Sequence, residues 1–235
     1  MNEALTIQGL SYRRNQKQIL KDVNLTLPDG QIVGLLGANA AGKTTLMRLI
    51  AGSAIHFRGT IAVAGETEVA LRKSRVSFST QLDGFDANWR VGQVADVMAM
   101  LFADFRSEDY IQLVSLLGLS QKQRIKRLSK GNQRKLGLAV TLARRAQLYL
   151  LDEPFDGIDV MTRKAMLNSI LQWKPETATM VISDHHVEDI ERLLDQVVVI
   201  KDQTVVAQED ADNIRAQGQS IETYFESFYG GETHD

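Results

Sequence analysis

The sequence predicts an α/β fold, in which helices cover a sheet of mainly parallel strands. Two observations indicate this fold. Short apolar stretches typical of buried strands alternate with stretches of helical periodicity, most clearly over residues 148–200, and this alternation is typical of a parallel sheet. The chain of 235 residues is also long enough for one large domain with its own hydrophobic core.

The first part of the chain is predicted to form mainly strands. Residues 4–10 (ALTIQGL) and 23–27 (VNLTL) alternate apolar and polar side chains, as half-buried strands do. Residues 31–37 (QIVGLLG) are almost all apolar, which is typical of a strand buried on both faces. Residues 43–52 (KTTLMRLIAG) then have helical spacing, and Gly52 is placed to end that helix.

The middle of the chain changes from strand to helix and back. Residues 60–65 and 75–80 have strand patterns again, whereas residues 90–127 have helical periodicity and form a candidate helical insertion. After the insertion, strands and helices alternate. The expected strands are 148–152, 179–183 and 196–200, and the expected helices lie near 160–172 and 186–194.

The composition excludes several classes of protein. A net charge of −2 lacks the strong positive balance of a nucleic-acid binder, and the basic run over residues 122–135 is interpreted as a solvated helical face. The absence of cysteine excludes disulfides and thiolate metal sites. The first residues lack the pattern of a signal peptide, and no apolar run approaches the roughly 20 residues of a membrane-spanning helix. Contact with a membrane would therefore require another chain.

One glycine-rich stretch carries a specific chemical prediction. Residues 37–44 match G-x-x-x-x-G-K-[ST], the Walker A pattern, between a predicted strand and a predicted helix. Glycines let the backbone curl around phosphates, and the N–H groups at the start of the helix favour an anion. The lysine reaches the β and γ phosphates, and the first threonine holds Mg²⁺. The predicted ATP-binding residues are Gly37, Ala38, Asn39, Ala40, Ala41, Gly42, Lys43, Thr44 and Thr45.

A second motif predicts what happens to the nucleotide. Residues 148–154 (LYLLDEP) form an apolar strand that ends in two carboxylates. Asp152 is placed as a Walker B aspartate, which holds Mg²⁺. Glu153 is placed to orient a water molecule and to accept its proton. An adjacent glutamate favours hydrolysis over transfer of the phosphoryl group to a second substrate.

Between the two Walker motifs, residues 127–145 (RLSKGNQRKLGLAVTLARR) resemble the signature motif of ATP-binding cassette (ABC) proteins, usually LSGGQ followed by a basic helix. Gln81 matches the glutamine of the family's Q-loop, Asp159 the aspartate of its D-loop, and His185 its switch histidine. Six motifs in the family's order cover nearly the whole chain, which is similar to the nucleotide-binding subunit of an ABC transporter.

This resemblance implies a fold and a domain division. The family fold is a P-loop NTPase core with a parallel sheet, an N-terminal antiparallel β subdomain and an α-helical subdomain. In this sequence, 1–235 would be a single ABC ATPase domain. Its core and β subdomain would span about 1–84 and 128–209, its helical subdomain about 85–127, and a short C-terminal helical tail 210–235.

The resemblance also implies roles for single residues. Glu153, His185 and Gln81 would be catalytic, and the cofactors would be ATP and Mg²⁺. Two copies, or this chain and a similar one, would pair head to tail, so that the signature of one chain meets ATP bound by the other. The signature residues are Ser129, Lys130, Gly131 and Asn132, the D-loop residue is Asp159, and the magnesium ligands are Thr44, Gln81 and Asp152.

The sequence departs from the family pattern in places. The signature reads LSKGN, with Lys130 for a glycine and Asn132 for a glutamine. The position of the aromatic residue that often stacks on adenine holds Arg14, with Tyr12 two residues earlier, so either residue or neither stacks on the base. Residues 121–127 (QKQRIKR) lack the segment of exporters with fused membrane domains, which favours a separate subunit.

The function expected from these motifs is ATP hydrolysis that powers a separate transmembrane permease at the cytoplasmic face of the cell membrane. Export of a peptide, antibiotic, lipid or drug-like compound is the favoured direction, because residues 220–231 resemble the C-terminal helix of subunits that serve such exporters. One alternative is a soluble ABC ATPase acting on ribosomes or DNA. Another is a P-loop kinase or GTPase, which the signature, Glu153 and the lack of a guanine-specificity motif disfavour.

Overall fold

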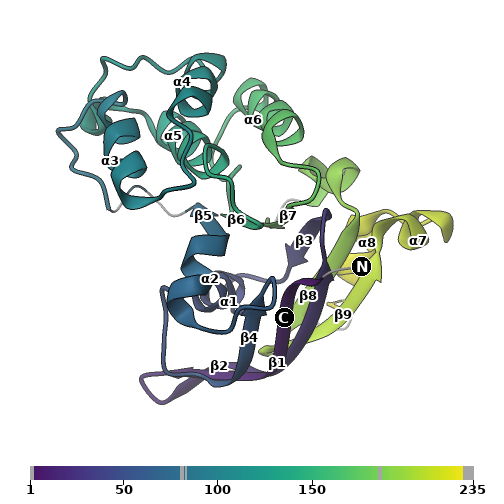
Figure 1. Ribbon diagram of the computed structural model, residues 1–235. Coiled ribbons are helices and arrows are strands. Elements are labelled where there is room, and N and C mark those ends of the chain that lie inside the picture. Colours follow the sequence, from purple (N-terminus) through teal and green to yellow (C-terminus); the bar gives the residue numbers. More distant parts are fainter. Residues whose placement is uncertain (1–2, 80–81, 83, 185–186, 230–235) are drawn as a thin grey trace.

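The structure is a computed structural model that describes residues 3–79, 82, 84–184 and 187–229. These residues form two sheets and a group of helices (Figure 1). None of the helices in this part of the chain is both long and apolar enough to span a lipid bilayer.

The larger sheet has six strands in the order β5-β6-β7-β3-β8-β9. Neighbouring strands pair in parallel from β5 to β8, and β9 pairs with β8 in the antiparallel direction. The α/β class with a parallel sheet, predicted from strand and helix alternation, is therefore confirmed. The strands are β3 (Ile32–Leu36), β5 (Val76–Ser79), β6 (Leu148–Asp152), β7 (Thr179–Ser183), β8 (Gln196–Lys201) and β9 (Thr204–Asp210).

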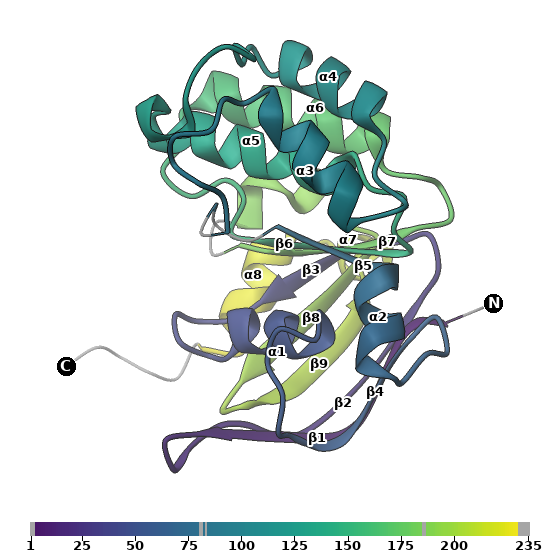
Figure 2. The same ribbon diagram turned by 60° about the vertical axis from the view of Figure 1, so that its left-hand side comes forward.

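The smaller sheet is antiparallel and comes from the first part of the chain. Its strands are β1 (Glu3–Arg14), β2 (Lys17–Pro28) and β4 (Arg58–Val63), in the order β2-β1-β4. Helix α1 (Lys43–Ile50) lies between this sheet and the six-stranded sheet (Figure 2). The antiparallel β subdomain implied by the family resemblance is present.

The six-stranded sheet separates two hydrophobic clusters, because successive side chains of a strand point to opposite faces. In β6, Leu148 and Leu150 pack with α1 and the antiparallel sheet, whereas Tyr149 and Leu151 pack with the helices on the other face. Figure 2 shows these helices above the sheet. They are α3 (Gln93–Leu101), α4 (Ser107–Leu116), α5 (Lys130–Leu142) and α6 (Val160–Trp173).

The remaining helical segments are short. Three of them were not predicted or were predicted wrongly. Residues 69–75 form α2 where no helix was expected, and the helix expected near 186–194 is wrong, since residues 187–193 form two 3₁₀ turns. Val187 and Ile190 are both buried, and a spacing of three residues suits a 3₁₀ turn as well as an α-helix. These segments are α2 (Val69–Arg75), η1 (Ile125–Arg127), η2 (Val187–Asp189), η3 (Glu191–Leu193), α7 (Ala211–Ala216) and α8 (Ile221–Ser227).

A buried arginine joins the helical layer to the sheet. Arg144 follows α5, and its Nε donates to Asp104 Oδ1 over 3.1 Å. Its Nη1 and Nη2 donate to the backbone oxygens of Val76 (2.5 Å) and Ser74 (3.1 Å), and its guanidinium carbon lies 4.0 Å from the centre of the Phe102 ring. One side chain therefore connects the segment between α3 and α4 with the start of β5.

Replacing this arginine is expected to destabilise the fold. Arg144→Met leaves the Val76 oxygen and the Asp104 carboxylate without their buried donor, and we expect a loss of about 2–4 kcal/mol in the free energy of unfolding. Urea denaturation measures the loss. Arg145→Met is the matched control, because the Arg145 side chain is 41% exposed where it pairs with Asp109, against 5% for Arg144, and exposed pairs contribute about 0–1 kcal/mol. Equal losses for both variants would contradict the prediction.

Candidate nucleotide-binding site

The candidate site lies at the carboxyl ends of three adjacent strands. The Walker A loop follows β3, Asp152 ends β6, and Ser183 ends β7. Because β6, β7 and β3 are neighbours and run in parallel, their carboxyl ends meet at one edge of the sheet. Ligands of open α/β sheets bind at this edge.

The Walker A loop is held closely on two sides, and its glycines are needed for that fit. A side-chain carbon on Gly37 would lie 2.7 Å from the Ile200 backbone oxygen, and one on Gly42 would lie 2.8 Å from Leu20 Cδ2. The φ angle of Gly42 is 111°, a left-handed conformation that favours glycine. The loop therefore lies between β8 and β2, where any larger residue at either glycine would clash.

The start of α1 offers backbone donors to an anion. Helix α1 begins at Lys43, directly after the loop, and no side chain caps it with a hydrogen bond. Its first turn contains no acidic residue. Uncapped N–H groups and the positive end of the helix dipole favour a phosphate at this position.

The Lys43 side chain is buried and lies against the loop. Its Nζ donates to the backbone oxygens of Gly37 (2.6 Å) and Ala38 (3.1 Å). Burial lowers the pKa of Lys43, while the carboxylates of Glu153, Asp152 and Asp184 act in the opposite direction. To bind a phosphate, the ammonium would exchange these two carbonyl oxygens for phosphate oxygens, which carry more negative charge.

Thr44 and Asp152 meet although they are far apart in the sequence. Thr44 Oγ1 donates to Asp152 Oδ1 over 3.0 Å, and Ser183 Oγ donates to the same carboxylate oxygen over 2.8 Å. Hydroxyl and carboxylate oxygens are the ligands that Mg²⁺ prefers. The donor set of Thr44 and Asp152 therefore fits the predicted magnesium site. Within the described residues, no cluster of three or more His, Cys, Asp and Glu side chains suits a metal held by protein alone.

Glu153 is held in an unusual backbone conformation. Its φ angle is 46°, in the left-handed region that residues other than glycine rarely occupy. Its backbone N–H donates to Ser183, with the nitrogen 3.0 Å from Oγ and 3.1 Å from the backbone oxygen. Strained residues of this kind cluster at active sites, because the surrounding structure must hold them. Here β7 holds the backbone of Glu153 beside Asp152.

The signature and D-loop residues start two neighbouring helices. Ser129 caps α5 and accepts a hydrogen bond from the Asn132 N–H over 3.2 Å. Asp159 caps α6 and accepts from the Thr162 N–H, a bond that lowers the pKa of Asp159. Ile158 lies close to Gly131. Among the described residues, no hydrogen bond joins residues 129–132 to the Walker A loop.

The two candidates for adenine stacking occupy different environments. Tyr12 is partly buried and pairs with Leu20, the residue that contacts Gly42. Arg14 is exposed and pairs with Lys17 near the end of the β1–β2 hairpin. Tyr12 is thus one strand away from the Walker A loop. This position favours Tyr12 over Arg14 as the candidate for stacking on adenine.

Some site residues were not found from the sequence, and others lie outside the described residues. Ser183 bonds to Asp152 and Glu153, Asp184 acts on Lys43, and Tyr229 contacts the loop. The only sequence signal for Ser183 and Asp184 is their place at the end of an apolar strand. The predicted residues Gln81 and His185 lie outside the described part of the chain.

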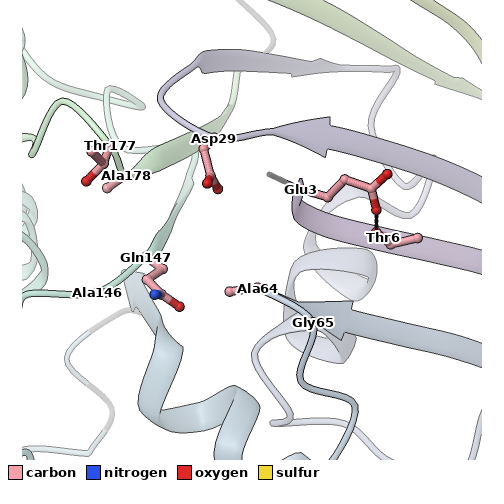
Figure 3. A pocket seen from close by; sticks show the side chains of 9 residues that line it. All are labelled: Glu3, Thr6, Asp29, Ala64, Gly65, Ala146, Gln147, Thr177 and Ala178. Atoms are coloured by element: carbon pink, nitrogen blue, oxygen red, sulfur yellow. Dashed lines mark hydrogen bonds between the residues drawn. The ribbon is translucent and has the colours of Figure 1, made fainter. Parts of the chain in front are cut away.

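A separate cavity of about 580 Å³ lies at the opposite edge of the sheet (Figure 3). Gln147 and Ala178, which precede β6 and β7, line it together with Glu3 and Asp29. Both carboxylate residues are exposed, and Glu3 accepts a hydrogen bond from Thr6 Oγ1, drawn as a dashed line in Figure 3. The cavity is therefore not part of the candidate nucleotide site.

The fold and these motifs define a nucleotide-binding protein with a P-loop, and comparison with known proteins identifies its family. The sequence profile described as ABC transporter matches residues 20–156, and the chain belongs to this family. ABC transporter ATP-binding protein YtrB of Bacillus subtilis is 30% identical over 95% of this chain and 77% of YtrB. A solved ATP-binding subunit of an ABC transporter has the same fold, with a TM-score of 0.84 at 24% identity over 95% of this chain and 98% of that one. ATP-binding proteins of the family are ATPases.

Other relatives are named for different functions. Nod factor export ATP-binding protein I of Rhizobium leguminosarum is 30% identical over 84% of this chain and 66% of its own. The manganese transport system ATP-binding protein MntB of Bacillus subtilis is 26% identical over 83% of this chain and 82% of MntB. The energy-dependent translational throttle protein EttA of Haemophilus influenzae is 30% identical over 78% of this chain and 32% of EttA. Family membership therefore does not determine a cargo.

Proposed function

We propose that this chain is the subunit that hydrolyses ATP to power a separate transmembrane permease, and that the transporter exports a peptide, antibiotic, lipid or drug-like compound. The observation that carries the ATPase part is the meeting of Thr44, Asp152 and Glu153 at the end of the Walker A loop. ATP-binding subunits of the ABC family dimerise and work with permeases, which supports the rest. The resemblance of residues 220–231 to tails of exporter subunits favours export.

The proposed reaction assigns one task to each residue. The Walker A backbone and Lys43 bind the β and γ phosphates. Thr44 and Asp152 would hold Mg²⁺, which neutralises phosphate charge when bound. Glu153 accepts a proton from water as the water oxygen attacks the γ phosphorus. The bond to the oxygen between the β and γ phosphates breaks, and ADP and inorganic phosphate leave. Gln81 and His185 are proposed to contact the γ-phosphate as in the family.

We infer that the complete site needs two chains. In a head-to-tail pair, Ser129 and the Gly131 N–H of one chain would contact the γ-phosphate bound by its partner. The start of α5 suits an anion, because the first N–H groups of a helix are positively polarised. Residues 129–132 make no hydrogen bond to the Walker A loop of their own chain within the described structure. The partner is an identical or a similar chain.

A groove between the sheet and the helical layer is proposed to receive the permease. This cavity of about 380 Å³ is mainly apolar and lies beside the end of α1, β5, α3 and α5. Phe85 lines it, and the Trp89 ring packs edge-on against Phe85 with ring centres 6.2 Å apart. Leu101 lies at the groove and is 67% exposed. In the proposed division into a core (about 1–84 and 128–209) and a helical subdomain (about 85–127), the groove would lie at their boundary.

Copurification tests the transporter proposal. The Glu153→Gln variant is purified by affinity from native membranes with ATP present, and the accompanying proteins are identified by mass spectrometry. A protein with several membrane spans in stoichiometric amount is the expected result, at the cytoplasmic face where ATP is available. Its identity would narrow the cargo.

A matched variant keeps this experiment specific. Adding Leu101→Glu places a charge in the apolar groove at an exposed position, so we expect the membrane protein to be lost while ATP binding remains. Ribosomes, nucleic acid or soluble proteins in place of a membrane protein would instead favour a non-transport ABC ATPase. The similarity to EttA, which is named as a translational throttle protein, is the reason for testing this alternative.

A further inference from the structure

The end of the described chain returns to the Walker A loop. Helix α8 begins after Ser220, whose Oγ accepts a hydrogen bond from the Thr223 N–H over 3.0 Å, and Ile221 anchors the helix in the core. A turn follows α8, and it brings Tyr229 to a loop 191 residues earlier in the sequence. The family motifs do not include this tyrosine.

The ring of Tyr229 is held by contacts that do not involve its hydroxyl group. Its centre lies 5.1 Å from the Phe225 ring and 5.1 Å from Lys201 Nζ. The same Lys201 Nζ donates to the Phe228 backbone oxygen over 2.8 Å. Removing the hydroxyl alone would therefore leave the ring in place.

The hydroxyl group connects the Walker A loop to β8. It accepts a hydrogen bond from the Ala38 N–H over 3.1 Å and donates one to the Ile200 oxygen, also over 3.1 Å. The Ala38 oxygen accepts a hydrogen bond from Lys43 Nζ, so both the N–H and the oxygen of Ala38 are hydrogen-bonded. The Ile200 oxygen is also the atom that a side chain on Gly37 would strike.

We propose that Tyr229 is a positioning residue of the ATP site, which holds the first half of the Walker A loop against β8 through its hydroxyl group. This inference rests on the proposed role of residues 37–45 in binding ATP. A loop that is ordered before the nucleotide arrives loses less conformational entropy on binding, and the affinity is correspondingly higher. The hydroxyl adds no charge. It therefore acts by keeping the loop ordered and does not change the electrostatic attraction of the phosphates.

The test is Tyr229→Phe, which removes one oxygen atom and keeps the ring. We expect the Kd for ADP, titrated calorimetrically, to rise about three- to tenfold, the equivalent of one net hydrogen bond. The KM for ATP should rise by a similar factor while kcat stays unchanged, because the hydroxyl bonds to the backbone of Ala38 and Ile200 and not to the residues proposed to act on the water or the γ-phosphate. The Ala38 amide should exchange its hydrogen faster in the nucleotide-free protein, as followed by nuclear magnetic resonance.

Tyr224→Phe is the matched control. Tyr224 lies on the same helix, and its ring packs edge-on against Phe228 with centres 5.2 Å apart. This variant should leave the ADP affinity and the Ala38 exchange rate unchanged. An equal effect of both variants, or no effect of Tyr229→Phe on either readout, would overturn the inference.

Failure of the inference can be told apart from failure of the proposed site. Lys43→Ala is titrated with ADP in parallel. If Lys43→Ala loses affinity and Tyr229→Phe does not, the positioning role is wrong and the site stands. If Lys43→Ala also binds ADP normally, the proposed site itself is wrong.

Discussion

Glu153→Gln is expected to lower the rate of ATP hydrolysis by about 10²- to 10⁴-fold, the usual contribution of a general base. ATP binding should remain, because glutamine keeps the shape of the side chain and the backbone N–H of residue 153 still donates to Ser183. In the proposed head-to-tail pair, ATP that is not hydrolysed would keep the two chains together. Phosphate release measures turnover, and size-exclusion chromatography with ATP should show a stable dimer.

The control for this variant is a nearby carboxylate whose side chain forms a salt bridge with an arginine of α5. Asp156 is exposed and pairs with Arg134 over 3.4 Å. Asp156→Asn should keep most of the ATPase activity. Full turnover in Glu153→Gln would show that another group accepts the proton and that Glu153 is not the base.

Lys43→Ala is expected to weaken ATP binding about 100-fold or more, since each hydrogen bond from a charged group contributes about 1.5–3 kcal/mol and Lys43 is proposed to reach two phosphates. The fold should survive, because the variant removes a buried charge whose burial itself costs free energy. The Gly37 and Ala38 oxygens lose a donor but lie on a loop open to water at Ala38. Calorimetric titration with ATP measures the loss.

Another lysine of the chain allows a close comparison. Lys174 is also partly buried, burial also lowers its pKa, and its Nζ donates to the Gly30 oxygen over 2.9 Å. It precedes β7 and therefore lies at the edge of the sheet opposite the Walker A loop. Lys174→Ala should leave ATP affinity unchanged. Equal affinities of Lys43→Ala and the unaltered protein would count against the phosphate site.

Local patterns predicted most elements, because their cause lies in neighbouring residues. The apolar run before the loop forms β3, the helical spacing after it forms α1, and Gly52 follows α1 with a φ angle of 69°, as a terminating glycine should. Strand β9 was not predicted. Its side chains alternate between partly buried and exposed, so it lacks the apolar run that marks the inner strands.

Sequence alone determined the α/β class, the Walker motifs and the family, since each depends on residue types at short, defined spacings. Tertiary structure decided which of these segments meet. The order β6-β7-β3 brings Asp152 and Ser183 beside Thr44, and the path of the tail brings Tyr229 to Ala38. No local pattern encodes such contacts, because strand order and tail docking depend on packing that the whole core must satisfy at once.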